Sequence, residues 1–354
     1  MITFYPGPSK VYPQIELYLS DAYHSGILSV NHRSEAFMKM LEGTIGSLKR
    51  KLDIPAGYEV YFVSSATECW EIISQSLVSN ASCHIYNGAF GAKWMEYAQK
   101  LNPDSHGISF DLNEAPGVEL LAGMRMEDDV ICITHNETSN GTALPVSFIK
   151  DLRRNTEKVI AVDATSSMAG IALPWLDADV WYASVQKCFG LPAGLGVMVV
   201  SPKAISKASE YNEQQHYNSL LFTRDNFLKF QTPYTPNTLA IYLLGRVMEQ
   251  VQPIETLSRE IGRRADEMYA LLETLGYPLL VHNEKVRSET VIAVKMEPTS
   301  LAAIKLKAKQ QNIVLGNGYG NWKEGTFRVA NFPAISSDDI SVLKHFLADF
   351  ESVS

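Results

Sequence analysis

Residues Asp179–Val200 read DVWYASVQKCFGLPAGLGVMVV, and the rest of the chain is interpreted from this stretch. An apolar run, Val180–Ala183, leads toward Lys187, and a turn rich in glycine and proline then leads into a second apolar run, Val197–Val200. The pattern predicts two strands joined by a turn that holds one lysine at the end of a sheet. Burial lowers the pKa of such a lysine and makes its amine a nucleophile toward carbonyl groups. Taken alone, the stretch also fits an ordinary surface lysine between two strands.

The composition of the whole chain is typical of a soluble globular protein. Of its 354 residues, 46% are apolar and 20% are charged, which suits two domains or one large α/β body with a smaller unit. The net charge of −8 and the lack of a basic stripe argue against a nucleic-acid partner. The chain has no run of 18 apolar residues, so no membrane span is expected. Its first residues, MITFYPGPSK, do not read as a secretion signal, and we expect a cytoplasmic protein.

The cysteines give no sign of a metal site. Most of them lie in apolar, strand-like contexts, which is typical of reduced core residues. They are scattered without a CxxC pair: Cys69, Cys83, Cys132 and Cys188. We therefore expect no metal ion.

A possible anion site follows the strand predicted at Glu59–Val63. A helix begins directly after this strand, and Ser65 and Glu68 have the spacing of a capping box. The free N–H groups and the dipole of a helix start both favour a bound phosphate. Ala66 and Thr67 lie at this start. Because every capped helix has such a start, this helix start indicates a phosphate site only in combination with other site residues nearby.

Other chemically useful residues also follow predicted strands. Phe90 begins the helix after the strand Cys83–Tyr86, where its ring could cover a pocket or start the core. The polar run His135–Gly141 follows the next strand, and Asp163 ends the one after that. Crevices of open α/β sheets lie at these carboxyl ends, and a buried carboxylate is costly unless it is paired.

The order of the predicted elements indicates two domains. Strands and helices alternate up to residue 200, which is typical of a mostly parallel sheet with helices on both faces. After that the pattern loosens, and Pro253 marks the expected boundary. We predict a large domain over 15–252 and a small α+β domain over 253–354 that includes the N-terminal arm 1–14.

Within the second half of the chain, several segments read as loops. Residues 211–236 are polar and irregular. The run Gly316–Gly320 reads as a flexible loop, and the strand after it, expected at 326–330, carries Arg328. The pair His32-Arg33 precedes an early helix and fits a solvated helix start as well as a binding role.

A pyridoxal 5′-phosphate site requires a lysine, a carboxylate, a hydroxyl, an aromatic ring and a phosphate-binding site. The helix start at Ala66 and Thr67, called the anion cup below, would be the phosphate-binding site. Over nearly its whole length the sequence resembles the class V aminotransferases of the type I pyridoxal-phosphate fold, and within them the phosphoserine aminotransferases. The resemblance implies a large domain with a mostly parallel sheet flanked by helices, a small C-terminal domain, and pyridoxal 5′-phosphate as cofactor. The matching motifs are Gln186-Lys187 with Gly190–Leu195, Asn136-Glu137-Thr138 with Gly141, His32-Arg33-Ser34, and Thr232–Thr235.

This resemblance implies a role for each residue around the lysine. Lys187 would bind the cofactor as a Schiff base and shuttle a proton. Asp163 would pair with the pyridinium nitrogen, and Thr138 would bond to the phenolic oxygen. Phe90 stands where the family usually has a stacking tryptophan. The cofactor phosphate would be held by Ala66, Thr67 and Gln186.

The resemblance also implies a homodimer with shared active sites. Gln231 and Thr232 would reach the cofactor phosphate from the other subunit. His32 and Arg33, also from the neighbour, would face the distal group of the substrate. Arg328 would bind the carboxylate of an amino acid or 2-oxo acid, for which its bidentate fork is suited.

One departure from this family concerns the loop before Arg328. In phosphoserine aminotransferases the loop usually carries a His-Arg pair that helps to bind the substrate phosphate. Here the segment Tyr319–Gly325 has Lys323 as its only cation. A hydrogen bond to a charged group contributes roughly 1.5–3 kcal/mol, so losing two of them would weaken phosphate binding considerably.

The departure leaves more than one function open. The leading interpretation is transamination of 3-phosphohydroxypyruvate by glutamate. The run His135–Gly141 looks rather like the alanine/serine–glyoxylate branch, which would use glyoxylate or pyruvate. Cysteine desulfurases and lyases of the class usually have a histidine before the lysine, where this chain has Gln186. A silent protein of the same fold is opposed by the intact lysine, aspartate and threonine.

Overall fold

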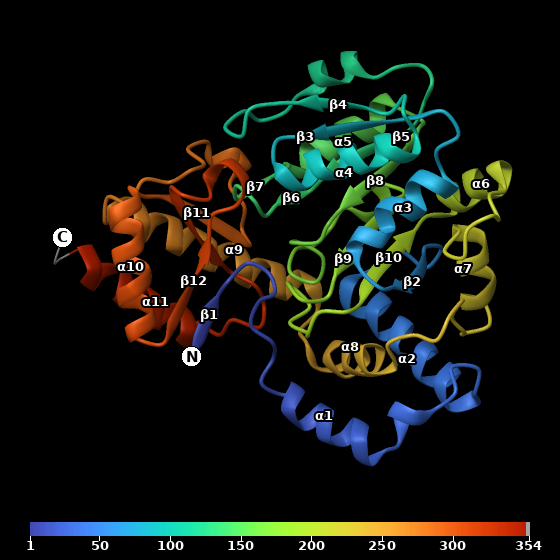
Figure 1. Ribbon diagram of the computed structural model, residues 1–354, viewed down its shortest axis with the longest axis horizontal. Coiled ribbons are helices and arrows are strands. Elements are labelled where there is room, and N and C mark those ends of the chain that lie inside the picture. The colour runs from blue at the N-terminus through green and yellow to red at the C-terminus, as the bar shows by residue number, and fades with distance from the viewer. Residues whose placement is uncertain (352–354) are drawn as a thin grey trace.

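The computed structural model describes residues 1–351 and contains two main sheets, each with its own helices (Figure 1). In the larger sheet β10 runs antiparallel to both of its neighbours, and all other neighbouring strands run parallel. This confirms the predicted mostly parallel sheet. In order across it the strands are β2 (Glu59–Val63), β10 (Gly196–Val200), β9 (Val180–Ser184), β8 (Val159–Asp163), β5 (Asp128–Thr134), β3 (Ala81–Tyr86) and β4 (His106–Ser109).

The central strands of this sheet are apolar because both of their faces are covered. Every residue of β8, β9 and β10 is buried, as expected for strands with helices on either side. Helix α3 packs on β9 and β10, and α4 packs on β3 and β4. The helices here are α3 (Ala66–Ser76), α4 (Ala89–Leu101), α5 (Val146–Asn155), α6 (Pro202–Tyr211) and α7 (Leu220–Phe227), with 3₁₀ turns η2 (Val118–Gly123) and η3 (Trp175–Asp177).

Three helices, drawn at the bottom of Figure 1, extend the large unit. Both α1 and α2 pack against α8. Arg246 of α8 helps to hold α1, because its guanidinium donates to Asp21 at 2.9 Å and lies 4.4 Å from the ring centre of Tyr18. The elements are α1 (Ile15–His24), η1 (Ile27–Ser29), α2 (Glu35–Leu52) and α8 (Thr238–Gln250).

The smaller sheet joins the two ends of the chain. Its order is β1-β12-β13-β11, and the N-terminal strand β1 pairs in parallel with β12. This pairing supports the proposed assignment of the arm to the small domain, whose last residues, 352–354, lie outside the described part. The elements are β1 (Ile2–Phe4), β11 (Val291–Lys295), β12 (Ile313–Asn317), β13 (Thr326–Ala330), α9 (Ile254–Thr274), α10 (Pro298–Gln310), α11 (Ser337–Glu351), η4 (Glu284–Val286) and η5 (Gly320–Trp322).

Two predicted loops were wrong in part. Helix α7 lies within the supposedly irregular residues 211–236, where the hydroxyl of Ser219 caps it by accepting from the backbone N–H of Phe222. The run Gly316–Gly320 begins inside β12, because backbone pairing with β13 extends to Asn317. Helix α7 also packs on α3 and β2, and β12 also pairs with β1, and local composition does not report these distant contacts.

The turn after β9 brings the lysine loop close to the start of α3. Gly190 and Gly194 have φ angles of +63° and +118°, which residues with side chains rarely adopt. A Cβ on Gly196 would lie 2.7 Å from the carbonyl carbon of Ser65. Glycine at this position therefore lets β10 approach the segment that joins β2 to α3, where the anion cup was predicted.

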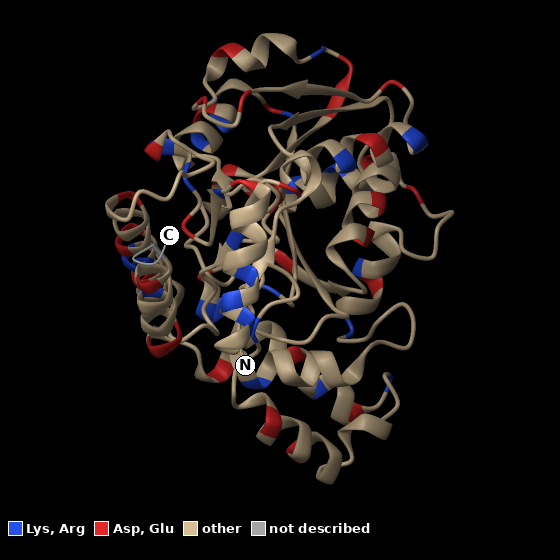
Figure 2. Ribbon diagram, turned by 60° about the vertical axis from the view of Figure 1, so that its left-hand side comes forward, with Lys and Arg blue, Asp and Glu red and all other residues tan. Residues whose placement is uncertain are grey.

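Basic and acidic residues are interspersed over both units (Figure 2). Several of them form ion pairs, such as Arg224 with Glu59 at 3.0 Å and Lys207 with Asp129 at 3.0 Å. None of the helices within residues 1–351 has both the length and the apolar character that crossing a membrane demands.

Asp179 ties together three strands of the large sheet, and its removal should destabilise the protein. Its carboxylate accepts from the backbone of Ile160 and from Arg153, both at 2.9 Å, and from the hydroxyl of Ser201 at 3.0 Å. Asp179→Ala leaves these donors unpaired in the interior, so the free energy of unfolding should fall by about 3 kcal/mol. Urea unfolding followed by tryptophan fluorescence measures this. The control Asp177→Ala, at a half-buried position nearby, should have little effect, and equal losses would contradict the role of Asp179.

Candidate active site

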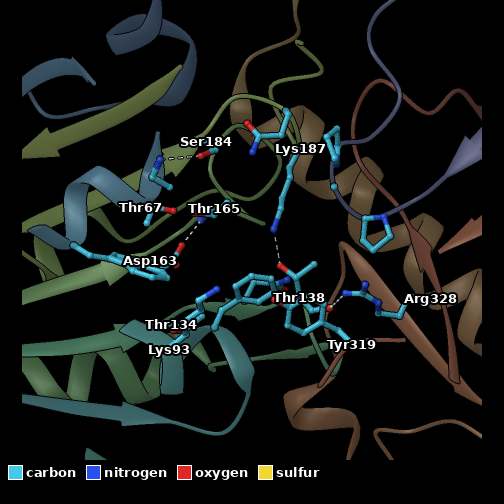
Figure 3. A pocket seen from close by; sticks show the side chains of 18 of the residues that line it. Thr67, Lys93, Thr134, Thr138, Asp163, Thr165, Ser184, Lys187, Tyr319 and Arg328 are labelled. Carbon is cyan, nitrogen blue, oxygen red and sulfur yellow. Dashed lines mark hydrogen bonds between the residues drawn. The ribbon is translucent and has the colours of Figure 1, made fainter. Parts of the chain in front are cut away.

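A pocket of about 360 Å³ lies where the carboxyl ends of the large sheet face the smaller unit (Figure 3). The N-terminal arm also lines it, with residues 5–8. The pocket brings together most of the predicted site residues from segments far apart in the sequence. These are Ala66, Thr67, Phe90, Thr138, Asp163, Gln186, Lys187 and Arg328.

Lys187 is buried at the centre of this pocket, with 8% of its surface exposed. Its Nζ donates to the hydroxyl of Thr138 at 2.8 Å and to that of Ser166 at 3.0 Å. Desolvation lowers its pKa to about 8, although the charges of Asp163 and Glu137 oppose the change. The structure therefore favours the buried amine over the alternative of a surface lysine.

Asp163 ends β8 and is buried beside the lysine. Its Oδ1 accepts from the backbone N–H of Thr165 at 2.9 Å. Desolvation raises its pKa, which the Thr165 hydrogen bonds and the charge of Lys187 only partly counter. A buried carboxylate in this state is stabilised by a further positive charge, and a protonated ring nitrogen would supply one.

Arg328 reaches the pocket from β13, on the opposite side from Asp163 (Figure 3). It donates to the backbone carbonyls of Thr138, at 2.5 Å, and Asn317, at 2.6 Å. Desolvation lowers its pKa to about 10. Because these two bonds use only part of its five-donor fork, Arg328 can also bind a carboxylate.

The start of α3, where the sequence predicts an anion cup, is a capped helix end that lines the pocket with Ala66 and Thr67. Ser65 caps this helix by accepting from the backbone of Glu68 at 3.2 Å. The reciprocal bond differs from the predicted capping box, because Glu68 accepts from the backbone and hydroxyl of Ser64, at 2.7 and 2.6 Å. The backbone N–H of Ala66 donates to the hydroxyl of Ser184 at 2.9 Å, so Ser184 joins the cup.

Phe90 lines the pocket, which decides between its two predicted roles. The backbone N–H groups of Phe90 and Gly91 donate to the carboxylate of Glu137, at 3.1 and 3.2 Å. The Phe90 ring stacks on Tyr319, with centres 4.9 Å apart and planes 22° from parallel. Glu137 thus fixes the start of α4, and Tyr319 supports the ring that is expected to cover a cofactor.

Sequence reasoning missed several residues of the pocket. Tyr319, Lys93 and Trp70 line it, as does Gly7 of the N-terminal arm. A Cβ on Gly7 would lie 2.9 Å from Cε of Lys187, so the arm contacts the lysine closely. The Pro-Gly-Pro run in the arm was the only local signal for this contact.

The residues expected to reach the active site of a second copy of the chain lie outside the pocket of their own copy. Arg33 donates to the side chain of Gln231 at 2.9 Å, so the two predicted loops meet each other. Thr232 lines a separate hollow beside the end of β2. His32, Arg33, Gln231 and Thr232 do not line the main pocket of the described chain, and their roles at a shared site stay predictions.

The pocket fits the phosphorylated ring that the sequence implies. Two of its buried polar atoms, Oγ1 of Thr134 and Nδ2 of Asn136, have no hydrogen-bond partner within the described residues. The anion cup, the carboxylate of Asp163 and the amine of Lys187 supply the groups for a phosphate, a ring nitrogen and an aldehyde.

Away from the pocket, three residues of neighbouring strands have candidate ligand atoms within 4.8 Å of one another: Cys83, His106 and Asp128. Nε2 of His106 is 3.0 Å from the carboxylate of Asp128, which also accepts from the backbone of Arg125 at 2.7 Å. Burial, with the charge of Asp128, raises the pKa of Cys83 to about 12. These contacts describe a His–Asp pair beside a protonated thiol, and the expectation of no metal ion stays a prediction.

The lowered pKa of Lys187 predicts unusual reactivity toward small amine reagents. Only the neutral amine reacts, so modification of cofactor-free protein should rise with a midpoint near pH 8 instead of near 10.5. Competitive acetylation followed by mass spectrometry of the peptide measures this midpoint. Lys93, an exposed lysine at the rim, is the internal control for the reactivity of the reagent. A midpoint above pH 10 for Lys187 would contradict its desolvation.

The chain resembles known proteins over most of its length. Residues 6–321 match the family model described as Aminotransferase class-V. The phosphoserine aminotransferase of Rhodococcus opacus (strain B4) is 31% identical over 350 residues, which cover 95% of this chain and 91% of that protein.

Solved structures agree with the predicted fold class. The crystal structure of a phosphoserine aminotransferase from Cytophaga hutchinsonii superposes with a TM-score of 0.92 at 32% identity and covers 98% of each chain. An aspartate aminotransferase from Thermus thermophilus superposes with a TM-score of 0.87 at 20% identity, over 100% of this chain and 99% of that one. The sequence resemblance and the predicted type of fold are thereby confirmed, and the chain belongs to the class-V aminotransferase family.

Proposed function

We propose that this chain is a pyridoxal 5′-phosphate-dependent phosphoserine aminotransferase, which transfers an amino group from glutamate to 3-phosphohydroxypyruvate and forms phosphoserine and 2-oxoglutarate. The observation that carries the proposal is the pocket that unites Lys187, Asp163, Thr138 and Arg328 in a chain of this family. The phosphoserine specificity is supported by the relatives of that name at 31–32% identity over almost the whole chain.

The pocket residues suit the proposed cofactor. When bound, pyridoxal 5′-phosphate supplies an electron-withdrawing ring that stabilises negative charge at the α-carbon of the substrate. Asp163 would keep the ring nitrogen protonated, and Phe90 would cover one face of the ring. Ala66, Thr67 and Gln186 would hold the phosphate at the start of α3, where N–H groups favour an anion.

Lys187 is the base that fits this reaction. With a pKa of about 8 instead of 10.5, about a tenth of the amine is neutral at pH 7, far more than for an ordinary lysine, and this fraction can take the α-proton of the substrate. The hydroxyls of Thr138 and Ser166 hold the amine in place. The protonated amine of Lys187 can then give the proton back on the cofactor side of the substrate nitrogen, and water is still needed to cleave the carbon–nitrogen bond and release the 2-oxo acid.

The two ends of the substrate would be held by different parts of the protein. Arg328 would bind the α-carboxylate inside the pocket. Arg33 and His32 of a second copy would bind the distal phosphate or carboxylate. Lys323 is not part of this arrangement in the described chain, because its side chain is 72% exposed and lies 4.0 Å from Glu324.

A homodimer is part of the proposal. Large apolar side chains are exposed along α1 and η1, namely Leu17, Leu19, Tyr23 and Leu28. Exposed apolar clusters of this kind mark surfaces that bind other proteins. Arg33 follows this segment in the chain and donates to Gln231. A partner that covers the apolar surface would therefore also meet these two residues.

The position of Lys323 keeps a second candidate open. Without the usual His-Arg pair, binding of the substrate phosphate would rest on Arg33 and His32. An alanine/serine–glyoxylate (or pyruvate) aminotransferase has no substrate phosphate to bind and would not need these two residues. A cysteine desulfurase is disfavoured, because all four cysteines are buried and none is available on an exposed loop.

Half-reactions with single amino acids should distinguish these candidates. We expect phosphoserine to convert the loaded cofactor faster than serine or alanine, because only its phosphate can bind a cationic distal site. Loss of the cofactor's absorbance band in stopped flow measures the rate. A faster reaction with alanine than with phosphoserine would favour the second candidate.

The same assay tests the distal site directly. Arg33→Ala should lower kcat/KM for phosphoserine about ten- to a hundredfold, the range of one charge-assisted bond, and should change alanine turnover less than threefold. Arg50→Ala is a matched control that should leave both substrates unaffected, because this arginine donates to Ser47 within α2 and does not line the pocket. Equal losses for both amino acids in Arg33→Ala would contradict its role.

A further inference from the structure

Asn136 is a buried residue of the pocket whose amide nitrogen has no assigned role. Only 5% of the residue is exposed, and it lines the same cavity as Lys187 and Arg328. Its Nδ2 forms no hydrogen bond with any described residue, whereas its Oδ1 accepts from the hydroxyl of Ser288 at 2.6 Å. An unpaired buried donor is costly, so this nitrogen is expected to have a ligand partner.

The surroundings of Ser288 determine which way the amide points. Its Oγ accepts from the backbone N–H groups of Thr290, at 3.1 Å, and Val291, at 2.9 Å. With both lone pairs engaged, the hydroxyl can only donate, and Oδ1 of Asn136 is its nearest acceptor. A rotated amide would place its NH₂ group against this hydroxyl without an acceptor. The orientation with Nδ2 away from Ser288 is therefore fixed by the network.

Asn136 and Glu137 point to opposite sides of their short strand. Successive side chains of a strand alternate, and β6 (Asn136–Glu137) pairs here with β7 (Thr142–Ala143). Glu137 points toward the start of α4, where it accepts from Phe90 and Gly91. Asn136 and Thr138 both line the pocket, and the carbonyl of Thr138 is the group that holds Arg328.

We propose that Nδ2 of Asn136 donates to the α-carboxylate of the substrate together with Arg328, and that Ser288 positions this donor. The assignment rests on the proposed function. A carboxylate has about four acceptor sites, and Arg328 already spends two of its donors on the carbonyls of Thr138 and Asn317. One further donor, Nδ2 of Asn136 in β6, would complete the binding of both carboxylate oxygens.

Ser288 belongs to the C-terminal half of the chain, which gives this contact a second consequence. Its backbone N–H donates to Gly141 at 3.0 Å, and its carbonyl accepts from the hydroxyl of Tyr269 on α9 at 2.9 Å. The orientation of Asn136 thus depends on correct packing of the C-terminal segment against the large unit. Arg328 comes from the same half of the chain, so both carboxylate donors require this packing.

Glutarate, the carbon skeleton of glutamate without its amino group, is an unreactive probe for this site. Calorimetric titration of glutarate into protein loaded with pyridoxal 5′-phosphate gives its dissociation constant. Asn136→Ala should raise this constant about ten- to a hundredfold, the range of a hydrogen bond to a charged group. Ser288→Ala should raise it severalfold, and the double variant should bind no more weakly than Asn136→Ala. Such non-additivity identifies Ser288 as acting through Asn136.

Three controls separate binding from folding. Asn321→Ala removes an exposed asparagine outside the pocket and should leave the dissociation constant unchanged. The melting temperature of Asn136→Ala and its affinity for pyridoxal 5′-phosphate should remain close to those of the wild type. A variant with weaker cofactor binding but normal glutarate binding would show that the amide serves the cofactor and would overturn the assignment.

The remaining outcomes distinguish this assignment from the proposed function. If the wild-type protein binds glutarate and Asn136→Ala changes the dissociation constant less than threefold, the role of Asn136 is contradicted but the proposed function is not. Failure of the wild-type protein to bind glutarate contradicts the proposed glutamate substrate, and the assignment falls with it. Additive effects of the Asn136 and Ser288 substitutions would contradict the positioning role of Ser288.

Discussion

The desolvation of one amine is the constraint on which the site depends. Lys187 is enclosed by the sheet ends, by the N-terminal arm and by the C-terminal unit, and this burial lowers its pKa to about 8. Asp163 and Glu137 oppose the change through their charges, but desolvation outweighs them. The hydroxyls of Thr138 and Ser166 hold the amine without adding charge. A neutral, oriented amine at near-neutral pH is what nucleophilic and proton-transfer chemistry requires.

This environment needs both units of the chain. The large sheet supplies the lysine, the aspartate and the anion cup from the ends of neighbouring strands. The C-terminal unit adds Arg328 and Tyr319, and the arm that forms β1 brings Gly7 against the lysine. The two proposed carboxylate donors, Arg328 and Asn136, are held by backbone carbonyls and by Ser288, so on this proposal substrate binding would depend on the packing between the two units.

The sequence predicted the part of the site that follows from strand order. Lys187, Asp163 and Thr138 each follow a strand, and parallel strands bring such ends to one edge, as the structure confirms. Tyr319 and Ser288 could not be predicted, because their roles come from contacts between segments more than 100 residues apart. Helix α7 and strand β12 were missed because they pack against or pair with distant segments, α7 with α3 and β2, and β12 with β1. The distal substrate site stays a prediction because Arg33 and Gln231 meet each other outside the pocket of the chain that bears them.

The most direct test of this account is whether the Lys187 amine binds pyridoxal 5′-phosphate covalently. Protein incubated with the cofactor and passed through gel filtration should retain a visible absorbance band, and borohydride should fix the label on the peptide that contains Lys187. Lys187→Ala should lose the band, whereas Lys93→Ala, at the rim of the same pocket, should keep it. A wild-type protein that stays colourless, or a Lys187→Ala variant that keeps the same band, would contradict the central claim.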